Sequence, residues 1–330
     1  MNEGMKRKMI FSAFMAVAVI TAGCSKTETT KIPEMGTIIF GKTFVGAPVK
    51  AATETTTDVL QGSGAGFYVY GGSEEKTDLF AGTHVTYNVD KWTYEDVRYW
   101  MPNKTYKFAA YAPDLTGASG EITFDYESGN GALTIADFVA DKDQQHDLVY
   151  AVATPKTTSS TIDVDPGIVD FSFKHILSKV LLKFEKGTGF ADHVKLVISN
   201  LKVYGMNSKA TYNGTTWTSQ AEPVEGGNAF TWSSVTENGN VPTSEALYLI
   251  PQSSATVNIS FDVALDDGQG TPTAPESKTG TITAAWDPDN VYTYTATINS
   301  TDLTNTYPIN FRGTVERWTS PDNTGTVTVQ

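Results

Sequence analysis

The stretch Val257-Asn258-Ile259-Ser260-Phe261-Asp262-Val263 carries an apolar side chain at every odd position and a polar one at every even position. Successive side chains of a strand point to opposite faces of its sheet, so this alternation predicts a strand with one buried face. The stretch from Tyr292 to Ile298 alternates in the same way. No long segment beyond residue 35 repeats its apolar residues with a helical period. The chain is therefore predicted to fold through strands.

Short runs rich in β-branched and aromatic residues recur along the chain, separated by Gly, Pro, Asn and Asp. Examples are Thr37–Val45, Gly66–Tyr70, Tyr106–Tyr111, Ile168–Phe173, Lys179–Phe184 and Val194–Tyr204. Many short strands at this spacing are typical of all-β sandwiches. A stretch rich in Pro, Thr, Ser and Asp, residues 154–167, is the best joint between two domains. We therefore expect an N-terminal β-sandwich over 36–160 and a C-terminal β-sandwich over 161–330.

The composition of the chain excludes several classes of protein. It has 330 residues, of which 40% are hydrophobic and 18% charged, and its net charge is −13. This low charge and the 11% of aromatic residues argue against a disordered chain. An acidic chain presents no electrostatic footprint for nucleic acid or an anionic membrane surface, so we expect no nucleic-acid partner.

The first residues have the features of an export signal. The basic patch Lys6-Arg7-Lys8 precedes an apolar run from Met9 to Ile20 that is too short to span a membrane as a helix. The run ends in Thr21-Ala22-Gly23-Cys24, which resembles a bacterial lipobox, and Cys24 is the single cysteine of the chain. A single cysteine cannot form a disulfide within the chain. We therefore predict a lipoprotein signal peptide over 1–23, lipidation at Cys24 and a flexible tether over 24–35; the alternative is an ordinary secretory signal with a buried cysteine nearby.

The residues that usually carry catalysis form no recognisable site. Among the four histidines, no pair has metal-ligand spacing, and we interpret His175 as structural rather than catalytic. There is no G-x-S-x-G elbow, and the glycine-rich stretch Gly62–Gly66 lacks the lysine of a phosphate-binding loop. The sequence thus predicts no enzyme, no catalytic residue, no metal and no cofactor.

The six tryptophans allow a second hypothesis, because sugar rings stack on exposed indoles. The candidates for such a platform are Trp92, Trp100 and Trp217. The competing interpretation is that these rings fill sandwich cores, since tryptophan is highly buried on average. A monomeric glycan-binding lipoprotein of the outer-membrane surface therefore stays open as the alternative function.

A set of motifs along the chain gives the sequence a family resemblance. They begin with Trp92-Thr93-Tyr94, Tyr99-Trp100-Met101-Pro102 and the run from Tyr106 to Pro113, and continue with Asp147–Ala151, Phe171–Val180, Leu249-Ile250-Pro251-Gln252 and Trp286 followed by Tyr292-Thr293-Tyr294. In this order they resemble the fimbrillin-like proteins of Bacteroidota, which are lipoprotein precursors of type V pili.

The resemblance implies a fold and a way of assembly. It implies two transthyretin-like β-sandwiches and export to the outer membrane as a lipoprotein, followed by a place in a cell-surface fimbria. A protease then removes the lipidated N-terminal strand, and the open groove accepts a strand from a neighbouring subunit. Such a groove offers unpaired backbone groups and an apolar floor, and an added strand satisfies both. The implied partners are other fimbrial subunits, the outer membrane through the lipid, and a receptor on a host or bacterial surface.

The implied roles fall on particular residues of this chain. The removable strand corresponds to Thr37–Val45, in which Ile38, Phe40 and Phe44 are expected to share one face. The end of the chain, where Val327 and Val329 share a face, is the candidate donor strand; the alternative is that both segments are ordinary intradomain strands.

The family's usual processing site is an arginine after the first strand, but no arginine lies between Arg7 and Arg98. The nearest match is Lys50, preceded by Lys42. Either a lysine-accepting protease acts there, or the subunit keeps its lipid as an anchor.

Overall fold

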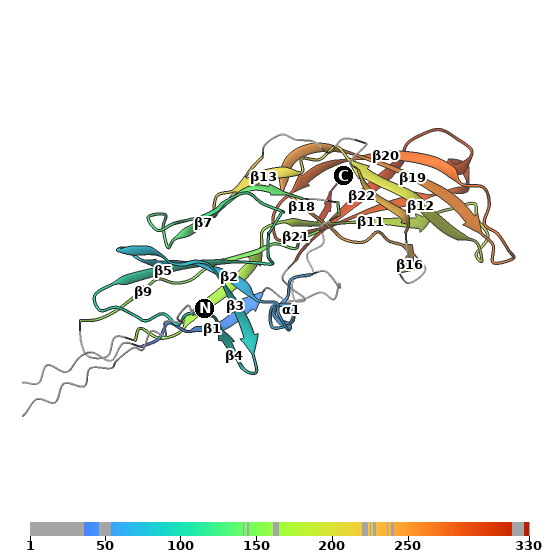
Figure 1. The fold of residues 1–330 in the computed structure, drawn as a ribbon. Coiled ribbons are helices and arrows are strands. Elements are labelled where there is room, and N and C mark those ends of the chain that lie inside the picture. The colour runs from blue at the N-terminus through green and yellow to red at the C-terminus, as the bar shows by residue number, and fades with distance from the viewer. Residues whose placement is uncertain are drawn as a thin grey trace, which may run out of the picture.

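The computed structural model describes residues 36–45, 54–140, 142–143, 145–160, 165–219, 224, 226, 229–235, 237–238, 241–318 and 327–329. The helices with described bounds are α1 (Thr57–Leu60) and the 3₁₀ turn η2 (Ser300–Leu303). The predicted all-β class is confirmed. None of the described helices has the length and apolar character needed to cross a membrane. Figure 1 shows an elongated molecule in which three sheets account for most of the strands.

The first sheet has the strand order β1-β10-β8-β5-β2-β3-β4, and β9 pairs with β5. Its strands are β1 (Phe40–Val45), β2 (Phe67–Ser73), β3 (Lys76–Asn88), β4 (Lys91–Thr93), β5 (Thr105–Ala112), β8 (Val149–Val152), β9 (Lys156–Thr157) and β10 (Val169–His175). Strand β1 runs parallel to β10, whereas the other described pairs of this sheet are antiparallel.

Strand β5 lies at the centre of the first sheet and is buried on both faces. Phe108 and Ala110 point into an aromatic core on one face, while Ala109 and Tyr111 belong to a second core on the other. A strand covered on both sides reads as a near-continuous apolar run, as residues 106–112 do.

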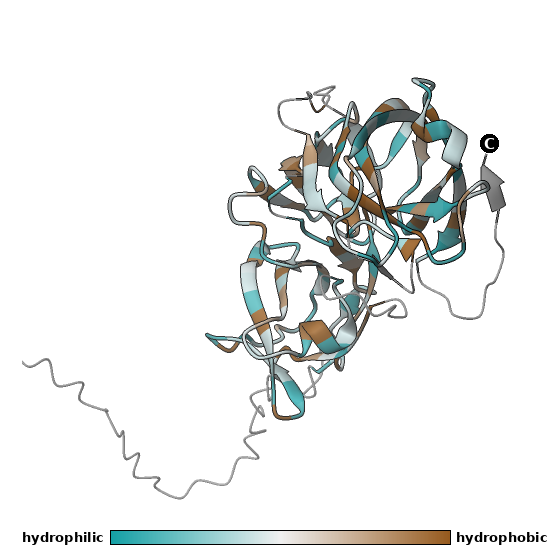
Figure 2. Cartoon of the chain, turned by 90° about the vertical axis from the view of Figure 1, so that its right-hand side faces the viewer, coloured by the Kyte–Doolittle hydropathy of each residue, from teal (hydrophilic) through white to brown (hydrophobic). Residues whose placement is uncertain are grey.

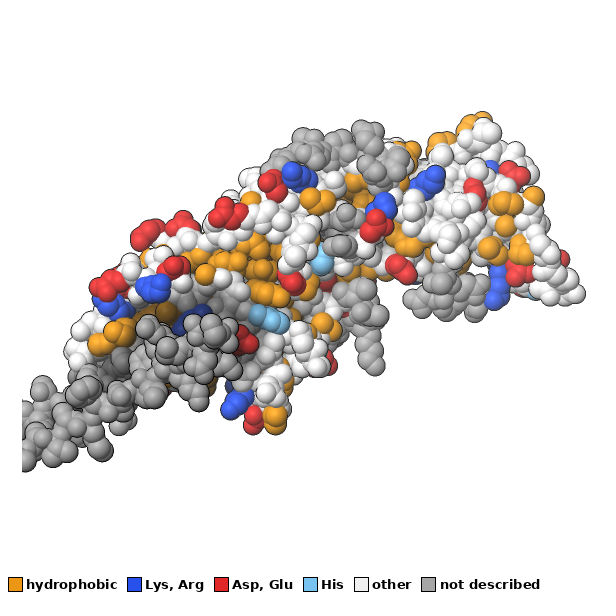
Figure 3. Space-filling view, viewed as in Figure 1, with side chains coloured by type: hydrophobic (Ala, Val, Ile, Leu, Met, Phe, Trp, Pro, Cys, Tyr) orange, Lys and Arg blue, Asp and Glu red, His pale blue; other side chains and the backbone are white. Residues whose placement is uncertain are grey.

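The small sheet covers the second of these cores, with the strand order β14-β13-β7-β6. Its strands are β6 (Ile122–Asp125), β7 (Ala132–Val139), β13 (Lys209–Tyr212) and β14 (Trp217–Ser219). Tyr150 of β8 meets Tyr212 of β13 with ring centroids 5.2 Å apart. Hydrophobic side chains gather on the surface where the small sheet meets the first sheet (Figure 3), and this core includes the half-buried Tyr68 and Phe124.

The second sheet has the order β15-β12-β19-β20-β22-β21-β11-β18, and β23 pairs with β22. Its strands are β11 (Ser178–Lys186), β12 (Lys195–Tyr204), β15 (Phe230–Ser234), β18 (Leu247–Leu249), β19 (Gln252–Asp266), β20 (Glu276–Trp286), β21 (Asn290–Ile298), β22 (Ile309–Arg317) and β23 (Val327–Val329). A separate pair joins β16 (Glu237–Asn238) to β17 (Val241–Pro242).

This second sheet folds over on itself to enclose a core. Strands β20 and β22 pair only at Gly280–Ile309 and Thr281–Asn310, and the two halves face each other on either side of this narrow join. Phe184 of β11 thus lies 4.8 Å, between ring centroids, from Phe261 of β19. All four apolar residues from Val257 to Val263 are buried, as their alternation predicts, and Figure 2 shows the same alternation along neighbouring strands.

The chain passes from the first sheet to the second between His175 and Ser178. Strand β10, which follows the domain boundary expected at residue 160, belongs to the first sheet and lies beside β8. The physical reason is its own alternation, because Val169, Phe171 and Phe173 all point into the aromatic core of that sheet. Strand pairing thus joins residues on both sides of residue 160, and β13 likewise pairs with β7.

Candidate functional site

Strand β1, the candidate removable strand, forms the edge of the first sheet. Its register sets Phe40 opposite Val169 and Phe44 opposite Ser172. The Val169 amide donates to the Ile39 carbonyl over 2.9 Å. Just before β1, the Ile38 amide donates to the carbonyl of Arg98 (2.8 Å), and the Trp100 amide donates to that of Gly36 (2.9 Å). An edge strand can leave without breaking the order of the strands that remain.

The ring of Phe40 is 3% exposed and is surrounded by aromatic rings. Five rings lie with centroids 5.3–6.2 Å from its own and form what we call the Phe40 socket, namely Phe67, Phe80, Tyr94, Phe108 and Phe171. Four of these contacts are edge-to-face, a geometry that aromatic pairs favour. The Tyr94 hydroxyl also donates to the Ile38 carbonyl over 2.5 Å. Ile38 and Phe40 therefore point inward, as the sequence predicts.

Phe44 does not share their face, and this part of the prediction is wrong. Its side chain is 57% exposed, whereas Thr43 and Val45 are buried. The register shifts between Phe40 and Thr43, so one extra residue reverses the alternation. Gly41 lies in this bulge, where an added Cβ would lie 2.1 Å from Cγ2 of Ile168.

The two candidate processing lysines differ in position. Lys42 is a residue of β1, and its amide donates to Oδ1 of Asp170 over 2.7 Å. Lys50 and the lipidation candidate Cys24 lie outside the described residues. The chain is described again from Glu54 onward, just before α1.

Glu54 and Thr55 are buried and anchor the chain at this point. Glu54 forms an ion pair with Lys179, the second residue of β11, and their side chains are 1% and 6% exposed. The Thr55 amide donates to Oδ2 of Asp147, and its hydroxyl to the Asp147 carbonyl, each over 2.6 Å. Oδ1 of Asp147 lies 2.8 Å from Nδ1 of His175.

Trp318 closes the same cluster from the other end of the chain. Its ring stacks on that of His175 with centroids 4.1 Å apart and planes 3° apart. Tyr248 stacks more distantly, with a centroid separation of 5.7 Å. We call Glu54, Thr55, Asp147, His175, Lys179 and Trp318 the junction cluster, because it joins the end of β10 to the start of β11. Glu54 and Thr55 hold the chain in this cluster just after residues 46–53, and Trp318 holds it there just before residues 319–326.

Asp289 lies beside the junction cluster, and one oxygen of its carboxyl, Oδ1, is buried without a hydrogen bond among the described residues. The Asp289 carbonyl accepts from the Trp318 amide over 2.9 Å. Burial raises the pKa of this carboxyl above its ordinary value, although His175, Arg317 and Lys174 oppose the shift.

Strand β23 carries the candidate donor residues and lies on its own chain. Val327 and Val329 are opposite Val315 and Gly313 of β22 in an antiparallel pair. The other edge of β22 pairs with β21 along nearly its whole length.

The tryptophans proposed for glycan binding separate into two groups. Trp92 and Trp100 are buried in the core of the first sheet, so they cannot form a platform. Trp217 is half-buried, and its indole nitrogen donates to the Ile176 carbonyl over 2.6 Å. It lines a cleft of about 990 Å³ together with Tyr212, Lys174 and Asp287. Within the described ranges, no group of three or more His, Cys, Asp or Glu could hold a metal ion.

Several of these features give no signal in the sequence. Glu54 and Lys179 are separated by 125 positions, and neither belongs to a charged motif. Trp318 counts in the sequence only as an aromatic residue near the end of the chain. The bulge that reverses the alternation of buried and exposed side chains after Phe40 has one sign in the sequence. This sign is the glycine at position 41, inside an otherwise β-rich run.

The fold defines an all-β protein of the kind found among solved fimbrial and adhesion structures. A fimbrial protein from Bacteroides vulgatus is similar, with a TM-score of 0.57 and 21% identity, over 86% of this chain and 99% of that one. A candidate cell adhesion protein from Bacteroides ovatus has a TM-score of 0.54 and 14% identity, over 88% and 100%. Residues 51–318 match the family model described as fimbrillin-like. The chain belongs to the fimbrillin-like family. Among curated proteins, no sequence matches it.

Proposed function

We propose that this chain is a structural or adhesive subunit of a cell-surface fimbria and that it assembles by strand exchange after β1 is removed. The observation that carries the proposal is the position of β1, a single edge strand seated on an aromatic socket and followed within nine residues by the anchored Glu54. Membership of the fimbrillin-like family supports an exported, cell-surface protein. No enzymatic activity is part of this function.

The ends of the family match support the same division of the chain. The matched range begins at residue 51 and ends at residue 318, so β1 and β23 both lie outside it. The junction cluster holds the chain at Glu54 and at Trp318, close to both limits. Removal of β1 thus leaves this buried attachment in place.

Lys50 is the better of the two processing candidates. A cut after Lys42 would leave half of β1, including the buried Thr43 and Val45, on the sheet. A cut after Lys50 would remove the whole strand, together with the lipid on Cys24. Before the cut, that lipid would hold the precursor in the outer membrane.

The test is the N-terminal sequence and the mass of the protein purified from the cell surface. The proposal predicts a chain that begins at Ala51 and carries no acyl group. A chain that begins with an acylated Cys24 in the assembled fimbria would contradict processing. In a surface protein that stays monomeric, the same N-terminus would support the glycan-binding lipoprotein instead.

One observation favours glycan binding as a second candidate function, namely the half-buried Trp217 in its cleft. We expect Trp217→Ala to abolish retardation in polysaccharide-containing gels, and the buried Trp92 offers no surface for the same role. An unchanged shift in the Trp217→Ala protein would remove this candidate.

A further inference from the structure

We propose that the uncut precursor rests on the lipid bilayer with an apolar patch at the start of β1. Nine large hydrophobic side chains of the described residues are exposed, and six of them make up what we call the outer patch, namely Ile39, Phe44, Val97, Tyr99, Met101 and Ile168. Their exposed fractions run from 43% to 57%. The inference rests on the proposed lipid at Cys24, and it adds a direct contact between the folded protein and the membrane.

The edge of the first sheet supplies one half of the outer patch. The first registered pair of β1 and β10 is Phe40 with Val169, and both side chains are buried. Successive side chains of a strand point to opposite faces, so Ile39 and Ile168, one residue earlier on each segment, lie side by side on the outer face. Phe44 lies further along the same face of β1, because the bulge turns it outward.

The loop before β5 supplies the other half. Thr37 forms an antiparallel bridge to Tyr99 on the side of β1 that faces away from β10. Along this loop Val97, Tyr99 and Met101 are exposed, whereas the ring of Trp100 is fully buried. Thr37 is exposed as well, and residues opposite each other on neighbouring strands point to the same face. The three exposed side chains of the loop therefore continue the outer face of β1.

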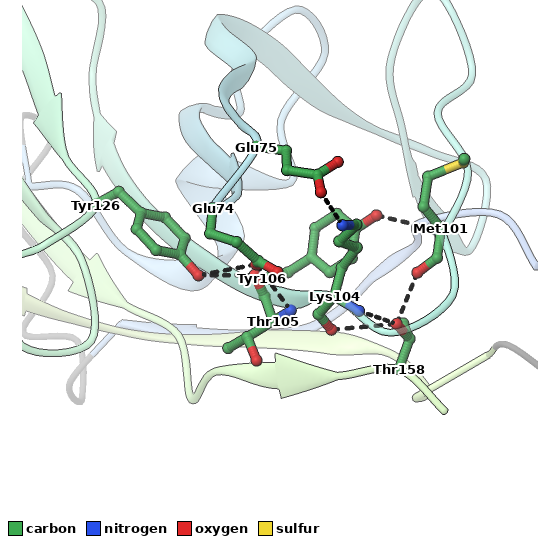
Figure 4. A network of polar contacts seen from close by, with 8 residues as sticks. All are labelled: Glu74, Glu75, Met101, Lys104, Thr105, Tyr106, Tyr126 and Thr158. Atoms are coloured by element: carbon green, nitrogen blue, oxygen red, sulfur yellow. Dashed lines mark hydrogen bonds and ion pairs between the residues drawn. The ribbon is translucent and has the colours of Figure 1, made fainter. Parts of the chain in front are cut away.

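Polar contacts hold the backbone of this loop. Figure 4 shows the Met101 amide and carbonyl turned toward two hydroxyl groups, while its thioether points away from them. The amide donates to the Tyr106 hydroxyl over 2.8 Å, and the carbonyl accepts from the Thr158 hydroxyl over 2.6 Å. Nε of Arg98 donates to the Leu79 carbonyl over 2.6 Å. The loop therefore presents its apolar side chains on a fixed backbone.

The outer face of β1 stays open in the described part of the chain. The small sheet packs over the outer face of β5 and β8, and the core beneath it includes no described residue of β1. Exposed apolar side chains that are grouped in this way mark a site of interaction with a protein or a membrane.

The position of the lipidation candidate selects a membrane as the partner. Twelve positions separate Cys24 from Gly36, the first described residue. The Gly36 carbonyl accepts from the Trp100 amide over 2.9 Å, next to Tyr99 of the outer patch. An extended chain of twelve residues spans at most roughly 40 Å. A lipid at Cys24 therefore keeps the patch within this distance of the bilayer and raises its effective concentration there.

The chemistry of the outer patch fits the surface of a neutral bilayer. Tyr99 combines an apolar ring with a polar tip, as side chains at a membrane interface do. Lys42 is exposed on the same face of β1 as Phe44, and its apolar stem allows the charge to reach the headgroups. The net charge of the chain is −13, so the contact comes from apolar burial rather than from attraction to anionic lipids.

The membership of the outer patch links it to the precursor. Ile39 and Phe44 lie on the segment that the proposed cut after Lys50 removes, whereas the other four members stay on the body. The cut would thus remove the lipid and two members of the patch in one step. The whole patch exists before cleavage, when the protein is attached to the membrane, and this favours a bilayer over a partner in the assembled fimbria.

The test places a polarity-sensitive fluorophore in the outer patch of the purified lipoprotein. Acylation occupies the sulfur of Cys24, so an introduced cysteine is the single free thiol. Val97→Cys carries the label within the patch. Tyr307→Cys carries it outside the patch, just before β22, at a side chain that is 76% exposed. Both proteins are reconstituted in phosphatidylcholine vesicles that contain a spin-labelled phosphatidylcholine as quencher.

We expect the lipid to quench the label at residue 97 at least about threefold more strongly than the label at residue 307, since apolar faces that lie on a membrane reach roughly 5–10 Å into the headgroup boundary. Met101→Glu should lower the quenching at residue 97 to the level at residue 307. Val59→Glu places the same charge at an exposed valine outside the patch and should leave the quenching unchanged. High salt should have little effect, because salt screens charges and not apolar contacts.

Equal quenching at residues 97 and 307 would overturn the inference. Two other occupants of the patch are outcomes of a control with the labelled protein that begins at Ser25, in the absence of vesicles. A blue shift of the emission at residue 97 that grows with protein concentration would assign the patch to a second copy. A blue shift, relative to residue 307, that is independent of concentration would assign it to another segment of the same chain. Either result would overturn the contact with the membrane.

A second anchor separates this inference from the lipid at Cys24. A mass without an acyl group would contradict the proposed lipidation. In that case a hexahistidine tag before Ser25, bound to a nickel-chelating lipid, attaches the chain to the vesicle at nearly the same point. Strong quenching at residue 97 would then support the patch although the natural anchor fails, and its absence would overturn the patch as well.

Discussion

At the scale of single residues, the Glu54–Lys179 ion pair is a buried restraint on the chain just beyond the proposed processing site at Lys50. Both side chains are almost fully buried, so removal of one partner leaves the other charge uncompensated. We expect Lys179→Met to lower the free energy of unfolding by about 3–5 kcal/mol, measured by urea denaturation.

Two variants control this prediction. Glu54→Leu combined with Lys179→Met should regain most of the loss, because a packed apolar pair replaces the buried ion pair at little cost. Lys104 pairs with Glu75, whose side chain is 71% exposed, and Lys104→Met should cost no more than about 1 kcal/mol. Equal losses at Lys104 and Lys179 would contradict the special role of the buried pair.

Asp289 gives a pH-dependent prediction. Because burial raises its pKa in the folded protein above the ordinary 3.8, ionised Asp289 disfavours the folded state. The carboxyl is protonated in both states below that value, and its penalty grows as pH rises from the ordinary pKa through the folded pKa. Asp289→Asn should therefore raise the melting temperature at pH 7 and have little effect near pH 3.

Asparagine is a suitable replacement because residue 289 has a positive φ of 61°, which asparagine tolerates as aspartate does. A stabilising effect that is the same at both pH values would contradict this account of Asp289.

Residue-level prediction from sequence succeeds where alternation is regular and fails where it is interrupted. Ile38 and Phe40 are buried as expected, but the bulge at Gly41 turns Phe44 to the solvent. The junction cluster cannot be predicted by pattern at all, because its members come from distant points of the chain and meet only in the folded protein.

At the scale of elements, the tail is predicted to be needed for assembly and dispensable for folding. β23 pairs with only part of β22, and the body of the family match ends before it. Deletion of residues 325–330 should abolish heat-sensitive ladders. The melting temperature of the monomer, measured by circular dichroism, should change by no more than about 2 °C, since few contacts are lost.

Ladders that persist after this deletion would rule out the tail as donor. A large fall in melting temperature would instead make β23 an ordinary strand of the second sheet.

The sequence predicts well which segments form strands, but it predicts less well which strands pair with one another. The alternating run of β19 is a strand with the predicted burial, and the β-rich run Tyr106–Tyr111 is a strand as predicted. The same kind of pattern in β10 could not reveal which sheet the strand joins, because that choice depends on the aromatic core built by residues 67–108.

At the scale of the whole molecule, the two ends that we propose to exchange flank one anchored body. Glu54 fixes the body where the N-terminal strand connects, and Trp318 fixes it where the tail departs, at the same cluster. In the proposed exchange this attachment stays in place, while the removal of β1 takes Ile38, Phe40 and Val45 out of the aromatic core of the first sheet.

Hydrogen exchange of β10 in three forms of the protein is the most direct test of this account. The backbone of residues 169–173 faces β1, and the Val169 amide bonds to the Ile39 carbonyl. We predict slow exchange in the precursor, fast exchange in the trimmed monomer, and slow exchange again in the fimbria once a neighbouring strand is seated. Protection of these amides that survives trimming, or that fails to return in the fimbria, would contradict strand exchange at β10.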